Sequence, residues 1–311
     1  SMLLIKSKIS KVNPYKNPDA HKDNLEKLYD ILPFSLTDNQ NVVVKEILSD
    51  LHSNQTMIRM LQGDVGSGKT IVALISMLSA ISDGSQSVLL VPTEILAIQH
   101  FNTISELLKP LNIEVCLLLG ESKSNYSKKD RLAVIENISN GTIKIIIGTH
   151  ALISKKVNYK NLSLAIIDEQ HRFGVKQRVK ITEKGKNVNI LVMTATPIPR
   201  SLALTAYGDM NISTITEKPK GRKPIKTYVL SQSKIGEVLQ SIKRAIANEA
   251  LIYWVCPLIE ESENLDLIAV NERFEYLKSY FKDYNISLVH GKQDKLEREN
   301  SINDFKKGKS K

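Results

Sequence analysis

The segment GDVGSGKT, residues 63–70, is the feature that most restricts how this chain can fold. It contains three glycines in eight residues and stands between the apolar run MIRML (57–61) and the apolar stretch TIVALISML (70–78). Gly63, Gly66 and Gly68 let the backbone turn where a residue with a side chain would be strained. We therefore expect a strand, a tight turn and a helix in direct succession, the arrangement from which α/β proteins are built.

Short apolar runs alternate with amphipathic stretches along the chain. The stretch TEILAIQHFNTISELL, residues 93–108, has the apolar spacing of a helix and follows one such run. Strands that alternate with helices predict an α/β protein with a parallel, doubly wound sheet. The runs predicted to form its strands are 57–61, 87–91, 114–119, 143–148, 164–168 and 189–194.

The alternation is interrupted once, at EKPKGRKP, residues 217–224, which holds two prolines, a glycine and four basic residues. We predict a domain boundary there. The expected parts are an N-terminal arm with a linking helix (1–33), a first domain (34–218) and a partial second domain (225–311). In the second domain we expect strands at 226–230, 251–256 and 286–291, and helices at about 233–248, 264–282 and up to 307.

Composition narrows the class of protein. With 311 residues, 42% hydrophobic and 24% charged, the chain has the makeup of a globular protein with full cores. No apolar run reaches the roughly 18 residues of a membrane helix, and the N-terminus lacks a secretory signal pattern, so we expect a cytoplasmic protein and no membrane partner. Cys116 and Cys256 lie in separate apolar runs, which indicates buried core residues and no structural zinc.

Positive charge is concentrated in one part of the chain. The formal net charge is +10, and residues 151–190 contain nine Lys and Arg against three acidic residues. A solvated helix face would explain a run of charge, and a polyanionic partner would explain it equally well. The sequence pattern alone leaves both interpretations open.

The glycine turn also fits a phosphate-binding pattern. Residues 63–70 match GxxxxGK[ST] between a predicted strand and a predicted helix, the context of a P-loop. In that context the backbone amides surround phosphate oxygens, Lys69 neutralises them and Thr70 ligates Mg²⁺. The sequence therefore predicts a site for a nucleotide with its magnesium ion.

A second polar segment ends a predicted strand at LAIIDEQH, residues 164–171. An acid in this place completes the metal site of P-loop enzymes, which assigns Asp168 to Mg²⁺ and Glu169 to the attacking water. Gln170 and His171 follow as candidates for sensing the terminal phosphate. The next strand ends in TATPIPR, so we expect the hydroxyls of Thr194 and Thr196 to bond with this Gln-His pair.

Together these segments resemble superfamily 2 helicases, and the longer strings resemble the RecG family of bacterial ATP-dependent DNA helicases, which remodel branched DNA. The resemblance covers residues 32–307 and is most specific in IIDEQHRFGV. It implies RecA-like domains, the second of them incomplete, with ATP and Mg²⁺ as cofactors and branched double-stranded DNA, such as stalled forks and Holliday junctions, as the partner. The strings that carry it are LPFSLTDNQ, GDVGSGKT, PTEILAIQH, GTHAL, IIDEQHRFGV, MTATPIPRSLA and YWVCPLIEES.

The resemblance also assigns residues. Phe34 and Gln40 belong to an adenine-reading segment, although the bare sequence favours a core role for Phe34 and a helix N-cap region for FSLTDNQ. The implied nucleotide contacts run through Gly63, Asp64, Val65, Gly66, Ser67, Gly68, Lys69 and Thr70. The implied coupling residues are Thr194, Ala195, Thr196 and Arg200. The implied DNA contacts are Pro92, Thr93, Glu94, Gly148, Thr149, His150, Arg172, Lys176 and Arg178, although His150 by itself would be read as a structural histidine.

Two departures from the family pattern affect the expected activity. Family members have a wedge domain before the position of Leu32, and their second domain continues into motifs that include an arginine reaching the γ-phosphate. We therefore expect a shortened helicase core with weak ATP turnover. A nucleotide-gated DNA-binding module with little hydrolysis, and an ATPase that does not use DNA, stay open as alternatives.

Overall fold

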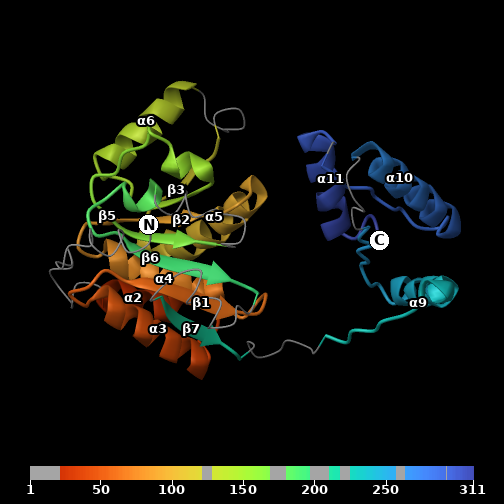
Figure 1. Ribbon diagram of the computed structural model, residues 1–311, viewed down its shortest axis with the longest axis horizontal. Coiled ribbons are helices and arrows are strands. Elements are labelled where there is room, and N and C mark those ends of the chain that lie inside the picture. The colour runs from red at the N-terminus through yellow and green to blue at the C-terminus, as the bar shows by residue number, and fades with distance from the viewer. Residues whose placement is uncertain are drawn as a thin grey trace. The chain divides into compact units, whose positions relative to one another are not determined.

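The computed structural model describes residues 22–120, 128–168, 180–196, 210–217, 225–256, 263–291 and 293–311. The chain divides into two compact units, Ser1–Lys223 and Pro224–Lys311 (Figure 1). Unit 1 contains the sheet, and the described part of unit 2 contains three α-helices.

The sheet of unit 1 has seven strands in the order β3-β4-β2-β5-β6-β1-β7, and every recorded strand pair is parallel (Figure 1). This confirms the predicted parallel sheet, and each of the six predicted strands is present. The seventh strand, β7, was not predicted. The strands are β1 (Ile58–Gly63), β2 (Gln86–Leu90), β3 (Val115–Leu118), β4 (Ile145–Gly148), β5 (Leu162–Ile167), β6 (Asn189–Thr194) and β7 (Asn211–Ile215).

Helices cover both faces of this sheet. One face packs against α2 (Lys22–Ile31), α3 (Asp38–Leu51), α4 (Lys69–Ile81) and α5 (Glu94–Leu108). The other face packs against α6 (Lys128–Ser139) and the short 3₁₀ helix η3 (His150–Ile153). A second 3₁₀ turn, η1 (Lys109–Leu111), follows α5 directly.

Side chains alternate between the two faces along each strand, as the two-residue period of a strand requires. In β6, Leu191 and Met193 join the core beneath α2–α5, whereas Ile190 and Val192 join the opposite core. All six residues of β6 are buried. The apolar runs of the sequence are continuous because both faces of a parallel sheet are covered.

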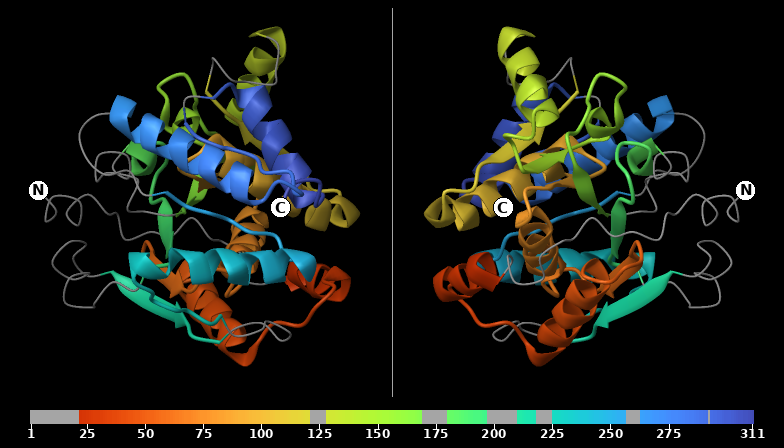
Figure 2. Two further views of the ribbon diagram at one scale, coloured as in Figure 1. Left: turned by 90° about the vertical axis from the view of Figure 1, so that its right-hand side faces the viewer. Right: turned by 90° about the vertical axis from the view of Figure 1, so that its left-hand side faces the viewer.

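Strand β7 is the edge of the sheet next to the P-loop strand. It pairs with β1 from Arg59↔Asn211 to Gly63↔Ile215 and is the teal arrow at the edge of the sheet in Figure 2. The buried Arg59 guanidinium joins β7 to α3, with Nη1 2.6 Å from Ser213 Oγ and Nη2 2.8 Å from Asp50 Oδ2. This ion pair and hydrogen bond hold the middle of β7 beside the C-terminal end of α3.

Unit 2 contains α9 (Ile235–Ala247), α10 (Glu263–Tyr280) and α11 (Lys295–Lys306), with the 3₁₀ turn η5 (Gln232–Lys234) before α9. These positions confirm the three predicted helices, each within two residues of the bounds that were predicted. A small apolar core joins Leu239 and Ile246 of α9 to Leu277 and Phe281 at the end of α10. No described helix of either unit is long and apolar enough to cross a bilayer.

The prediction of strands in unit 2 is wrong. Residues 226–230, 251–256 and 286–291 form no strand among the described residues. A strand requires a neighbouring strand with which it exchanges backbone hydrogen bonds. No strand pairing is recorded for the described part of this unit. Part of their apolar surface is open to solvent, with Val229 96% and Val255 81% exposed. Ile252, Trp254 and Ile286 are half-buried and pack against the small core of this unit.

Candidate nucleotide site

The P-loop lies between β1 and α4 as the sequence predicts. Gly66 and Gly68 have positive φ angles of 74° and 90°, which favour glycine over residues with a side chain. A Cβ on Gly63 would lie 2.6 Å from Ser67 Oγ and 3.1 Å from the carbonyl oxygen of Ile215. All three glycines are therefore required by the geometry of the turn.

Polar groups of the loop converge at the start of α4. The ammonium of Lys69 donates to the carbonyl oxygens of Gly63 (2.6 Å) and Asp64 (3.0 Å). Ser67 is 1% exposed, and its hydroxyl has no hydrogen-bond partner among the described residues. A helix N-terminus, a lysine and an unsatisfied buried hydroxyl around a glycine turn fit a bound phosphate group.

Gln40 lies against the loop and is almost fully buried. Its side-chain oxygen accepts from the backbone N–H of Thr37 (2.9 Å), and its Nε2 donates to the carbonyl oxygen of Ser67 (2.8 Å). Thr37 Oγ1 in turn accepts from the Gln40 backbone N–H (3.2 Å), which completes a capping box at the start of α3. This confirms the predicted N-cap region and shows that the amide of Gln40 bridges α3 and the P-loop.

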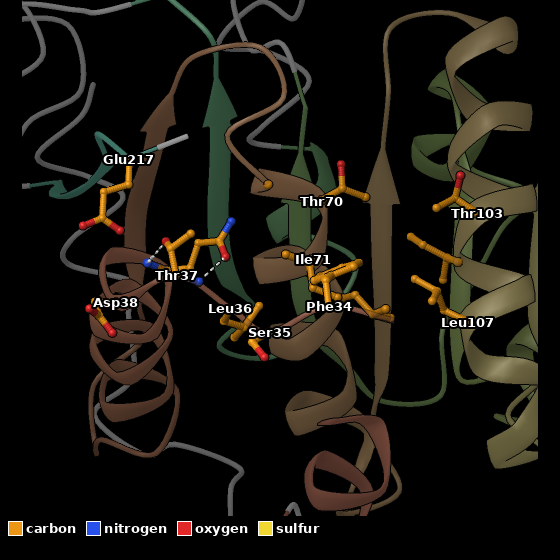
Figure 3. A pocket seen from close by; sticks show the side chains of 14 residues that line it. Phe34, Ser35, Leu36, Thr37, Asp38, Thr70, Ile71, Thr103, Leu107 and Glu217 are labelled. Atoms are coloured by element: carbon orange, nitrogen blue, oxygen red, sulfur yellow. Dashed lines mark hydrogen bonds between the residues drawn. The ribbon is translucent and has the colours of Figure 1, made fainter. Parts of the chain in front are cut away.

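A cavity of about 860 Å³ opens beside these groups (Figure 3). Phe34 lines it and is 51% exposed, so its ring is available to a ligand and the core interpretation of Phe34 is wrong. Figure 3 shows Thr103 and Leu107 of α5 on the wall opposite the start of α3. The other lining residues are Ser35, Leu36, Thr37, Asp38, Gln40, Gly68, Thr70, Ile71, Leu74, Ile104 and Glu217.

The predicted site segments that the structure describes meet at the carboxyl edge of the sheet. The strand order places them along this edge as Gly148–His150 after β4, Pro92–Glu94 after β2, Asp168 after β5, Thr194–Thr196 at β6 and the P-loop after β1. Ligands of parallel α/β sheets bind at this edge. Asp168 thus lies between the two turns assigned to DNA and the segments assigned to the nucleotide.

Two oxygen donors in this arrangement fit a magnesium ion. Asp168 is 8% exposed, and Thr70 is in the first turn of α4, where it lines the cavity. Among the described residues, no cluster of three or more His, Cys, Asp or Glu could hold a metal by itself. Mg²⁺ usually takes one or two protein oxygens, which Thr70 and Asp168 could supply, and fills its other positions with phosphate and water.

The TAT segment lies beside the P-loop strand, since Thr194 pairs in register with Gln62. Thr194 is 1% exposed, and its hydroxyl lies 3.0 Å from that of Thr196 and accepts from the Thr196 backbone N–H at 3.2 Å. Ala195 between them is half-buried. The predicted bonds from these hydroxyls to Gln170 and His171 involve residues outside the described ranges.

The two turns assigned to DNA lie on neighbouring strands, because β2 pairs with β4 up to Leu90↔Gly148. Glu94 Oε1 and the His150 ring both lie within 4 Å of the position of a Cβ on Gly120. Gly148 approaches the Leu118 carbonyl so closely that a Cβ would lie 2.2 Å from its oxygen. The side chains of Glu94 and His150 are thus gathered at one place on the edge.

Several predicted site residues lie outside the described part of the chain, so their positions stay predictions. They are Glu169, Gln170, His171, Arg172, Lys176, Arg178 and Arg200.

Sequence reasoning missed three groups that the structure brings to this site. Thr103 and Leu107 form a cavity wall, and Glu217 lines the cavity while its carboxylate accepts from the Asn39 backbone N–H at 3.2 Å. His100 contacts Asp168, with Nε2 3.2 Å from Oδ2. One signal was available for His100, since it interrupts the buried stripe of Ala97, Ile104 and Leu108 on α5.

Comparison with known proteins identifies the family. A family model described as DEAD/DEAH box helicase matches residues 37–205, more than half of the chain. The chain belongs to the DEAD/DEAH box helicase family. The chain has the RecA-like parallel sheet of that family, which confirms the predicted fold class.

The curated relatives most similar to the chain include RecG proteins. It is 44% identical over 311 residues to the ATP-dependent DNA helicase RecG of Aquifex aeolicus, covering 99% of this chain and 38% of that protein. Identity to RecG of Streptococcus pneumoniae is 46% over 280 residues, covering 90% of this chain and 41% of that protein. A solved structure of RecG bound to a three-way DNA junction superimposes with a TM-score of 0.78 at 35% identity. The match covers 99% of this chain and 40% of that chain. The chain spans about two fifths of the length of these relatives.

Proposed function

We propose that this chain binds ATP with Mg²⁺ in unit 1 and is the motor part of a RecG-type, ATP-dependent DNA helicase that acts on branched double-stranded DNA. The observation that carries the proposal is the arrangement at the sheet edge, where the P-loop, Asp168 and two polar turns follow strands of one sheet. The resemblance to RecG over almost the whole chain supports it. The proposal places the protein in the cytoplasm, where both ATP and chromosomal DNA are present.

In this proposal the residues of unit 1 have separate roles in binding and hydrolysing the nucleotide. The P-loop amides and Lys69 hold the phosphates, Phe34 contacts the base, and Thr70 and Asp168 hold the magnesium ion, which neutralises charge on the phosphates. Glu169 aligns the attacking water, and Gln170 and His171 respond to the terminal phosphate. The hydroxyls of Thr194 and Thr196 then pass that response to the neighbouring strand.

The DNA contacts in this proposal lie at the two turns after β2 and β4. Turns offer backbone amides and hydroxyls that bind phosphates regardless of base sequence. The buried Thr149 hydroxyl, which has no partner among the described residues, supports a ligand at this position. Arg172, Lys176 and Arg178 would extend the contact along the duplex, as the positive charge of residues 151–190 suggests.

A second candidate function is a nucleotide-gated DNA-binding module that hydrolyses little ATP. It is favoured by unit 2, whose described residues form no paired strands. In this case ATP would change DNA affinity without appreciable turnover.

ATP binding and hydrolysis, measured with and without DNA, test the two functions. We expect wild-type chain to bind ATP·Mg²⁺ in calorimetry, and Lys69→Ala to weaken binding at least about 100-fold because several charge-assisted hydrogen bonds are lost. Lys278→Ala, a charge removed from unit 2, is the matched control and should leave affinity unchanged. Unchanged ATP affinity in Lys69→Ala would reject the nucleotide site.

Hydrolysis then separates the candidates. A three-way junction that accelerates ATP turnover more than linear duplex of equal length supports the helicase motor. ATP-dependent junction binding with turnover at background supports the gated module. Turnover that ignores all DNA would instead indicate an ATPase with another partner.

A further inference from the structure

Asp168 is held at two points by one strand-turn-helix segment, β2 to α5. Its backbone N–H donates to the Leu90 carbonyl oxygen at the end of β2 (2.9 Å). Its side-chain Oδ2 lies 3.2 Å from His100 Nε2, two turns into α5. Both side chains are largely buried, with 13% of His100 and 11% of Asp168 exposed.

The chemistry of the pair fixes the direction of the hydrogen bond. An ionised carboxylate only accepts, so the proton of this bond is on His100 Nε2. In a site shielded from water such a bond is stronger than at the surface and restricts the carboxylate to one orientation.

A role in packing alone would account for the location of His100 on the buried side of α5. It would not account for the contact of the His100 ring with the Asp168 carboxylate. The buried stripe of α5, formed by Ala97, Ile104 and Leu108, would be continued equally well by a leucine. A polar ring placed there with its nitrogen at hydrogen-bond distance from a carboxylate orients that carboxylate. Partners that orient the ligands of a metal typically change metal affinity or activity by about 10- to 100-fold when removed.

We infer that His100 is a positioning residue for the Asp168 carboxylate and thereby sets the magnesium affinity of the nucleotide site. The inference rests on the proposed function, in which Asp168 holds the magnesium ion. It also gives the β2–α5 segment a second link to the site, because the turn at Pro92–Glu94 opens the helix that carries His100.

The test is the magnesium dependence of nucleotide binding in the 311-residue chain, measured by calorimetry with a non-hydrolysable ATP analogue. We expect His100→Ala to raise the Mg²⁺ concentration for half-maximal binding about 10-fold, while affinity in excess EDTA stays unchanged. His100→Gln carries an N–H at the reach of Nε2 and should restore most of the metal dependence. His100→Asn is too short and should resemble His100→Ala. Gln99→Ala, an exposed neighbour on α5, is the control.

Comparison of the variants separates the inference from the function on which it rests. If Asp168→Asn shifts the magnesium dependence and His100→Ala does not, the inference is overturned and the nucleotide site stands. If wild-type binding does not respond to Mg²⁺ at all, both are overturned. If His100→Ala fails to fold, the Gln and Asn variants decide, because equal magnesium dependence in those two would overturn the inference.

Discussion

Two similar apolar runs have different fates in the two units. NILVMT, residues 189–194, becomes β6 with all six side chains buried. LIYWVC, residues 251–256, is equally apolar, yet Leu251, Tyr253 and Val255 are exposed and form no strand. The first run lies between β5 and β1, and the second has no paired neighbour among the described residues. An apolar run specifies extended chain, and partners along its edges convert it into a strand.

The chemical reactivity of the two cysteines gives the largest expected contrast between the units. Burial, with a smaller effect of Glu114, raises the pKa of the Cys116 thiol to about 12, so at pH 8 its thiolate fraction is about a thousandfold below that of an ordinary cysteine. Cys256 in unit 2 is only half-buried. Iodoacetamide followed by peptide mass spectrometry should label Cys256 first, with Cys116 reacting only on unfolding. Equal labelling of both in the folded chain would remove this contrast.

Core truncation gives the next largest effect. Leu191→Ala, in fully buried β6, should lower the free energy of unfolding of unit 1 by about 2–5 kcal/mol because it leaves a cavity. Val229→Ala, at a side chain 96% exposed in unit 2, should change stability by less than about 0.5 kcal/mol. Urea denaturation followed by circular dichroism measures both. A loss above about 1 kcal/mol for Val229→Ala would show that this segment packs against something in solution.

Helix capping gives the smallest expected contrast. Thr37 caps α3 with its side chain, and Thr37→Ala should cost about 1 kcal/mol. Lys234 occupies the same position before α9 without a side-chain cap bond, so Lys234→Ala should have little effect. Thermal unfolding of the two variants provides the comparison. Equal loss in both would mean that the hydrogen bonds of Thr37 do not stabilise α3.

Local sequence predicted most of unit 1. The glycine spacing of the P-loop, six strands and the N-cap region of α3 follow from short-range rules, because each depends on residues a few positions apart. Strand β7 was missed because NISTI is half polar, with only Ser213 and Ile215 buried, as suits an edge strand.

Contacts between distant residues could not be predicted in the same way. His100 and Asp168 are 68 positions apart and meet only because β2 and β5 are neighbours in the sheet. The prediction of strands in unit 2 was wrong for a related reason, because a strand forms only where another segment of the chain pairs with it. Predicting contacts across the sheet therefore requires the strand order, and the pattern of apolar residues does not give that order.

Gln40 has a consequence for the energetics of ligand binding. Its amide is bonded at one end to Thr37 beside the base cavity and at the other to Ser67 of the phosphate loop. A ligand group that displaces either bond alters the support of the other segment. In the proposed nucleotide site, base and triphosphate would therefore contribute to affinity non-additively, and the coupling free energy between them would be the same in both directions. Under that proposal, a change of base would alter the affinity of the loop for phosphate.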